Sequence, residues 1–202
     1  MIGPLVRAVP RFAMVISVYA DRRTHEVADI AGRLAHASAK LVGPAGGGVV
    51  LVGPRLLGNH SSGELVARSV LMESHRPQEV GPLLGDLAGR YAVSVVILSG
   101  APNERVLAAF DASDRVLLLC DPSVASIRAT QRAIKLCRSL GYGLDKTAVV
   151  LHDFAEDAPL VPADAAAALK CDIYWSIPGH EAGAEARDTS FTRLAERLIA
   201  PT

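Results

Sequence analysis

Two apolar runs decide the fold, Tyr91-Ala-Val-Ser-Val-Val-Ile-Leu98 and Val116-Leu-Leu-Leu-Cys120. Both are short and rich in branched residues, which is typical of strands buried on both faces of a parallel sheet. Directly after the second run, Asp121-Pro-Ser123 begins a stretch with helical spacing that continues to about Leu140 and ends at Gly141. A buried strand that leads at once into a helix is the repeating unit of α/β proteins.

The same alternation extends along the chain in both directions. Further strands are predicted at 12–18, 49–52, 148–152 and 173–177, and further helices at 24–41, 64–73, 78–89, 163–169 and 192–200. We expect the polar segment 179–188 to be a mobile loop before the last helix. No linker or repeat interrupts the pattern. It therefore predicts a single domain over residues 1–202, an α/β fold with a doubly wound, mainly parallel sheet and helices on both faces.

Composition excludes several classes of protein. The 202 residues carry 21 Lys+Arg and 21 Asp+Glu, so the net charge is zero, and we expect no nucleic-acid partner. Hydrophobic residues make up 50%, too many for a disordered chain, yet no apolar run approaches the ~20 residues that span a bilayer. Arg7, Arg11 and the apolar run after them imitate a signal peptide, but a first strand explains them better. Three widely spaced cysteines indicate a reducing, cytoplasmic compartment.

The central segments resemble a known family. They are the run at 91–98, then Val106-Leu-Ala-Ala-Phe-Asp-Ala-Ser-Asp-Arg-Val-Leu-Leu-Leu119, Asp121-Pro-Ser-Val-Ala-Ser-Ile-Arg128 and Ser139-Leu-Gly-Tyr142. These segments are similar to the deviant P-loop ATPases of the MinD/ParA group, and most of all to its CpaE/TadZ branch, which places the Tad (Flp) pilus machine. The likeness spans about 14–178. It implies a fold like that of the P-loop NTPases.

The resemblance also implies a phosphate loop after the first strand, a Gly-rich turn with Lys and Thr that opens a helix. Here that slot reads Ala20-Asp-Arg-Arg-Thr-His-Glu-Val-Ala-Asp29. Thr24 and Glu26 stand where glycines are expected, Val27 where the lysine is, and Ala28 where the hydroxyl is. Without glycine the backbone cannot approach a phosphate closely, and acidic side chains repel it. The degenerate loop comprises Asp21, Arg22, Arg23, Thr24, Glu26, Val27 and Ala28, and its two arginines offset part of the repulsion without restoring the loop's shape.

Three other positions that the resemblance makes functional have changed as well. The Asp that contacts magnesium through water falls on Ile97, and the Asn that reads the base falls on His152. The acidic residue after the second strand is replaced by Gly53-Pro-Arg55. Because the buried strands remain while these groups are lost, the pattern indicates a non-catalytic pseudo-ATPase. We expect no catalytic residue, no cofactor and no bound metal.

Other patterns have plain explanations. Gly43-Pro-Ala-Gly-Gly-Gly48 precedes a strand, so it closes a helix and is no phosphate cradle. His60 with Glu64, or His152 with the acids at 153–157, could bind a cation. No two Cys or His residues have metal-ligand spacing, however, so a solvated acidic loop is preferred. Cys120 is expected to be a core thiol whose pKa is raised by neighbouring Asp121.

One helix carries a stripe of basic residues. Within 122–140 the cations are Arg128, Arg132, Lys135 and Arg138, and no acid follows Asp121. A solvated face is the default explanation, but such stripes also bind acidic partners or lipid head groups. We take the stripe as the candidate partner surface.

These observations favour a pseudo-ATPase scaffold similar to CpaE/TadZ. We expect it to form a homodimer or hetero-oligomer and to position or recruit proteins of a pilus, secretion or other envelope machine. It would be cytoplasmic, with at most peripheral contact at the inner face of the membrane. Two alternatives stay open. One is a MinD/ParA-type ATPase that uses Arg22, Arg23 and Thr24 unconventionally, and the other is an unrelated α/β enzyme with a deep polar pocket near Ser99, Asp121 and His152.

Overall fold

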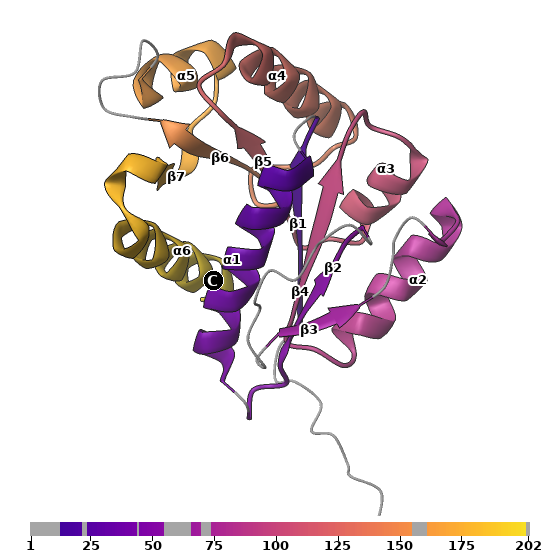
Figure 1. The fold of residues 1–202 in the computed structure, drawn as a ribbon. Coiled ribbons are helices and arrows are strands. Elements are labelled where there is room, and N and C mark those ends of the chain that lie inside the picture. Colours follow the sequence, from indigo (N-terminus) through magenta and orange to yellow (C-terminus); the bar gives the residue numbers. More distant parts are fainter. Residues whose placement is uncertain are drawn as a thin grey trace, which may run out of the picture.

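A parallel sheet forms the centre of the computed structural model (Figure 1), which describes residues 13–21, 24–43, 45–54, 66–69, 74–154 and 161–200. Within these ranges the sheet has seven strands in the order β3-β2-β4-β1-β5-β6-β7, and every neighbouring pair is parallel. The strands are β1 (Met14–Ala20), β2 (Val49–Val52), β3 (Val66–Ser69), β4 (Val93–Ser99), β5 (Arg115–Cys120), β6 (Thr147–Phe154) and β7 (Ile173–Pro178). The predicted α/β class with a doubly wound, parallel sheet is confirmed.

Except between β2 and β3, a described helix lies between each strand and the next, and the helices cover both faces of the sheet. They are α1 (Thr24–Val42), α2 (Pro77–Ala88), α3 (Glu104–Asp111), α4 (Val124–Ser139), α5 (Pro162–Leu169), the short 3₁₀ turn η2 (His180–Ala182) and α6 (Ala184–Ile199). Figure 1 shows α1 and α6 side by side, and the two helices contact each other. None of the helices in the described ranges combines the length and the hydropathy that a bilayer-spanning segment needs.

Alternation along the strands divides the core into two layers, because successive side chains point to opposite faces. In β1, Ile16 and Val18 pack with α1 and α6, whereas Val15 and Tyr19 pack on the opposite face. The helices α2, α3, α4 and α5 cover that second face. The central strands β1, β2, β4 and β5 are buried on both faces and are therefore almost entirely apolar, which is why they could be recognised in the sequence.

The structure corrects two sequence-based predictions and adds one helix. The helix expected at 64–73 is wrong, because Val66–Ser69 form edge strand β3, where pairing with β2 overrides the local pattern. The mobile loop expected at 179–188 is also wrong: η2 occupies part of it, and α6 starts at Ala184, eight residues before the predicted start. Helix α3 was not among the predicted helices; Asn103 caps it by accepting the backbone N–H groups of Arg105 and Val106.

Glycines with a positive φ follow the ends of two of these elements. Gly43 follows α1 with a φ of 66° and donates its N–H to the carbonyl of Ala39, so the Gly-rich stretch closes a helix as predicted. Gly100 follows β4 with a φ of 88°, a conformation that favours glycine, and ends the strand in a turn. Neither glycine opens a helix in the manner of a phosphate loop.

Candidate functional site

The connections place a crevice between the carboxyl ends of β1 and β5. Chain leaving β1 enters α1 on one face of the sheet, whereas chain leaving β5 enters α4 on the other face. Adjacent strands whose helices leave to opposite faces open a crevice at their carboxyl ends, and ligands of α/β proteins bind there. A cavity of about 160 Å³ lies at this point, lined among others by Tyr19, Asp21, Glu26, Asp121, Ser126 and His152.

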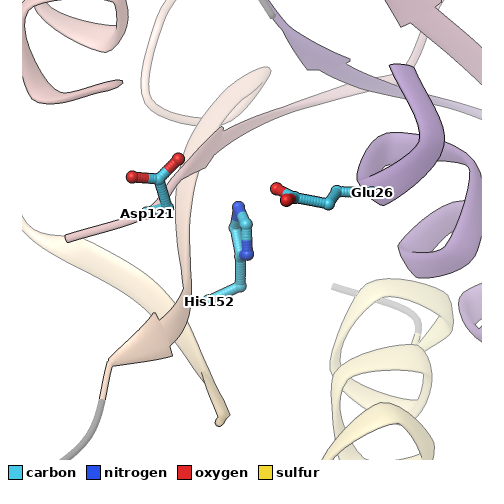
Figure 2. A group of neighbouring side chains, drawn as sticks. All are labelled: Glu26, Asp121 and His152. Atoms are coloured by element: carbon cyan, nitrogen blue, oxygen red, sulfur yellow. The ribbon is translucent and has the colours of Figure 1, made fainter. Parts of the chain in front are cut away.

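Three of these side chains come together. Glu26 lies in the first turn of α1, Asp121 directly follows β5, and His152 lies near the end of β6. One oxygen of each carboxylate and one ring nitrogen of His152 all lie within 4.8 Å of one another. Asp121 and His152 are 5% and 4% exposed, and Glu26 is half-buried. Figure 2 shows the ring of His152 between the two carboxylates, with the edge far from its Cβ turned toward the space between them.

A second layer of charged groups holds His152. The Nδ1 atom of His152 lies 3.1 Å from Oδ2 of Asp153, and this hydrogen bond, with help from the charge of Arg187, holds the pKa of Asp153 below its usual value. An ionised carboxylate only accepts hydrogen bonds, so Nδ1 is the donor. A neutral His152 therefore keeps its lone pair on Nε2, at the edge of the ring that faces Glu26 and Asp121.

Arg187 lies behind this pair, and sequence reasoning missed it. Its side chain is only 5% exposed, with Nη1 3.7 Å from Oδ1 of Asp153 and Nη2 3.9 Å from Oδ2 of Asp29. The residue belongs to α6, in the segment predicted to be a loop. A signal was present: Arg187 lies three and four residues before Ser190 and Phe191, which share its buried helix face.

Residues of the degenerate loop take different positions. Val27 and Ala28 are buried in the core, 1% and 4% exposed, and Thr24 is the first residue of α1. Asp21 follows β1, and its Oδ2 lies 2.9 Å from Nη2 of Arg132. Arg22 and Arg23 lie outside the described residues. Of the loop's acidic side chains, Asp21 and Glu26 both line the cavity.

The other predicted positions divide between core and cavity. Ile97 is 3% exposed and packs with the α1 and α6 layer, so an apolar side chain stands where the resemblance implies a magnesium-contacting carboxylate. His152, placed at the base-reading position, lines the cavity. The solvated acidic loop expected around it is wrong for His152 and Asp153, which are buried or partly buried. His60, Glu64 and the acids at 156 and 157 lie outside the described residues.

Cys120 is a core thiol as predicted, and the residues of the basic stripe are exposed. Cys120 is fully buried, and burial raises the pKa of its thiol, with a smaller contribution from the charge of Asp121. The direction is confirmed, although burial and not Asp121 is the main cause. All four basic residues of α4 are exposed: Arg128, Arg132, Lys135 and Arg138.

Comparisons with known proteins give fold relatives only. No protein-family model matches the chain, and no curated protein matches it. Solved structures do: a ParA family ATPase from Chlorobium tepidum TLS has a TM-score of 0.75 at 13% identity, over 92% of this chain and 100% of that one. The MinC:MinD cell division complex of Aquifex aeolicus has a TM-score of 0.72 at 16% identity, over 94% and 97%. The septum site-determining protein MinD of Pyrococcus horikoshii OT3 has 0.69 at 14%, over 92% and 95%. The chain thus has the fold of the MinD/ParA-type ATPases along almost its whole length.

Proposed function

We propose that this chain is a non-catalytic scaffold built on the MinD/ParA fold. In this proposal it dimerises, or joins other subunits, and positions or recruits proteins of an envelope-associated assembly such as a pilus machine, as the resemblance to CpaE/TadZ suggests. It acts in the cytoplasm and is recruited to the inner face of the membrane through its partners.

One observation carries the proposal. Among the fold relatives, MinD from Pyrococcus horikoshii forms a complex with Mg-ADP and a plasmid partition protein from Borrelia burgdorferi binds AMPPNP. In this chain the cavity beside the β1–α1 connection is lined by the carboxylates of Asp21, Glu26 and Asp121. Carboxylates at this edge of the sheet repel a polyphosphate. The side chains of Val27 and Ala28, at the places expected for lysine and a hydroxyl, are packed in the core and offer a phosphate no polar group. Both features support a site that has lost nucleotide chemistry.

The exposed stripe Arg128, Arg132, Lys135 and Arg138 supports a role in protein binding. Helix α4 carries no acidic side chain of its own, so its exposed face has a net positive charge, with Arg132 paired to Asp21. A fold relative, the MinD of Aquifex aeolicus, forms a complex with MinC, so the fold accommodates a protein partner. We assign the stripe as the partner surface of the scaffold, and the chemistry it fits is an acidic protein surface.

Calorimetric titration with ATP and with ADP, each with Mg²⁺, tests the loss of nucleotide binding. We expect no heat of binding at micromolar ligand and no phosphate release, with Pyrococcus horikoshii MinD as the positive control. Magnesium-dependent binding in the micromolar range would overturn the proposal. Phosphate release that Arg23→Ala abolishes would establish instead the alternative of an ATPase with an unconventional loop.

The alternative of an unrelated doubly wound α/β enzyme has less support than the scaffold, because the strand arrangement is similar to that of the MinD/ParA structures. Its expected polar pocket is present in part: Asp121 and His152 line the cavity together. The scaffold function does not explain why Asp121 and His152 line the same cavity.

A further inference from the structure

We propose that Glu26, Asp121 and His152 form a binding site for a divalent transition metal ion, Zn²⁺ in the first instance. The inference goes beyond the scaffold function and concerns the same cavity. It does not need a nucleotide, a partner or a particular assembly.

The donor set selects the ion. Two carboxylate oxygens and one imidazole nitrogen lie within 4.8 Å of one another, from three elements that the topology brings to one crevice. Calcium and magnesium prefer all-oxygen sites, whereas imidazole together with carboxylate suits zinc. Three protein ligands with one position left open, here facing the cavity of about 160 Å³, are the usual arrangement of a non-structural zinc site.

The histidine is prepared for coordination by groups outside the cluster. His152 is 4% exposed, and its Nδ1 is committed to Asp153, whose carboxylate is approached in turn by the buried Arg187. Histidine ligands of metals donate their second N–H to a carboxylate in this way, which fixes the ring and leaves Nε2 for the ion. The free edge of the ring points at Glu26 and Asp121 (Figure 2), so the orientation fits coordination.

The distances among the three donor atoms show how the side chains have to move when a metal ion binds. Ligand bonds of about 2.0–2.2 Å place tetrahedral donors about 3.4 Å apart. Any two of these donors that lie farther apart than this move closer together on binding. Glu26, in the first turn of α1 and half-buried, has a longer side chain than Asp121 and can supply most of this movement. Asp121 is anchored, since its Oδ1 accepts the N–H of Ser123 at 2.8 Å.

The test is a titration of the metal-free full-length chain with ZnSO₄, without nucleotide, followed by metal analysis after dialysis. We expect one ion per chain. Glu26→Gln, Asp121→Asn and His152→Gln each weaken binding at least about tenfold, and Asp153→Asn weakens it about 10–100-fold through the ring of His152. Asparagine tolerates the φ of 56° at position 153, so that variant keeps its backbone. His25→Gln, on the exposed side of the same helix, is the matched control and leaves affinity unchanged.

Cobalt provides a readout that does not depend on any variant. Co²⁺ in the wild-type chain is expected to give visible d–d absorption without a thiolate-to-cobalt charge-transfer band. A charge-transfer band would assign the metal to a cysteine such as Cys120 and overturn the proposal. A wild-type chain that binds neither Zn²⁺ nor Co²⁺ would also overturn it. So would a loss of affinity in the His25→Gln control equal to that in the ligand variants. Failure to bind metal leaves the scaffold proposal standing, and magnesium-dependent ATP binding overturns the scaffold proposal without touching the metal titration.

Discussion

Arg187 shows at the scale of one residue how a charge is kept inside this fold. Its guanidinium is almost completely buried and stands between Asp153 and Asp29, two carboxylates that are each about one-third exposed. A buried charge is costly unless it is compensated, and here two acids from different elements share the compensation. Asp153 in turn holds His152, so Arg187 connects α6 to the cavity.

Arg187→Met tests this arrangement. The apolar side chain keeps most of the volume but leaves both carboxylates without their buried partner. Since both remain in contact with water, we expect the free energy of unfolding to fall by about 1–3 kcal/mol, measured as a shift in the urea midpoint. Arg193→Met, at an exposed position of the same helix, is expected to stay within about 0.5 kcal/mol. A variant at 187 as stable as the wild type would contradict the role given to Arg187.

Helix α4 joins the cavity and the basic stripe at the scale of one element. Ser123 caps it by accepting the N–H of Ser126, and the helix N-terminus lies beside Asp121. Its inner face packs into the core through residues such as Ile127, Ile134 and Cys137. Its outer face carries the cations, of which Arg132 is paired with Asp21. The stripe is therefore held rigidly next to the site.

Charge reversal on α4 tests the partner surface. Arg128→Glu with Lys135→Glu leaves the Arg132–Asp21 pair in place and is expected to reduce capture of the chain's partners from native extract at least about tenfold, with an unchanged thermal melt. The matched control is Arg90→Glu with Arg193→Glu, which changes the net charge equally at exposed positions on other elements. Equal loss in both pairs would show that the effect is one of net charge, and the stripe would lose its assignment.

At the scale of the whole molecule, α1 and α6 together seal one face of the sheet. Phe191, Leu194, Ala195 and Leu198 of α6 are at most 3% exposed and join the core of α1 and the strands. Because Glu26 is on α1 and Arg187 is on α6, the packing that stabilises the domain also sets the geometry of the cavity. The C-terminal helix is thus part of the fold and of the site.

Leu194→Ala measures this contribution. Removing a fully buried leucine side chain costs about 2–5 kcal/mol, from lost burial and from the cavity that remains. We expect a loss of that size in denaturant unfolding. Leu144→Ala, at a side chain 80% exposed, should change stability by less than about 0.5 kcal/mol. Similar effects at the two positions would indicate that α6 does not pack as described.

Local sequence determined most of the architecture. The central strands β1, β4, β5 and β6 are buried on both faces, so an apolar run suffices to identify each. Helix α4 was recognisable from its cap, its period and its final glycine. Edge strand β3 could not be recognised from its local sequence, because its pairing with β2 decides its conformation. The first turns of α6 could not be recognised either, because the buried residue there is the charged Arg187 and not an apolar one.

The candidate site depended on distant contacts. The order of strands and helices in the sequence predicted the edge of the sheet at which a crevice would lie, and the absence of glycine, lysine and a hydroxyl at their expected places in 24–28 was what the resemblance to the MinD/ParA group implied. The sequence offered no reason to join Glu26 to Asp121 and His152, which are far apart along the chain and have no ligand spacing. Only the tertiary structure decided that, because the parallel order β1-β5-β6 brings the carboxyl ends of three strands to one point, and the switch of α1 and α4 to opposite faces leaves that point open.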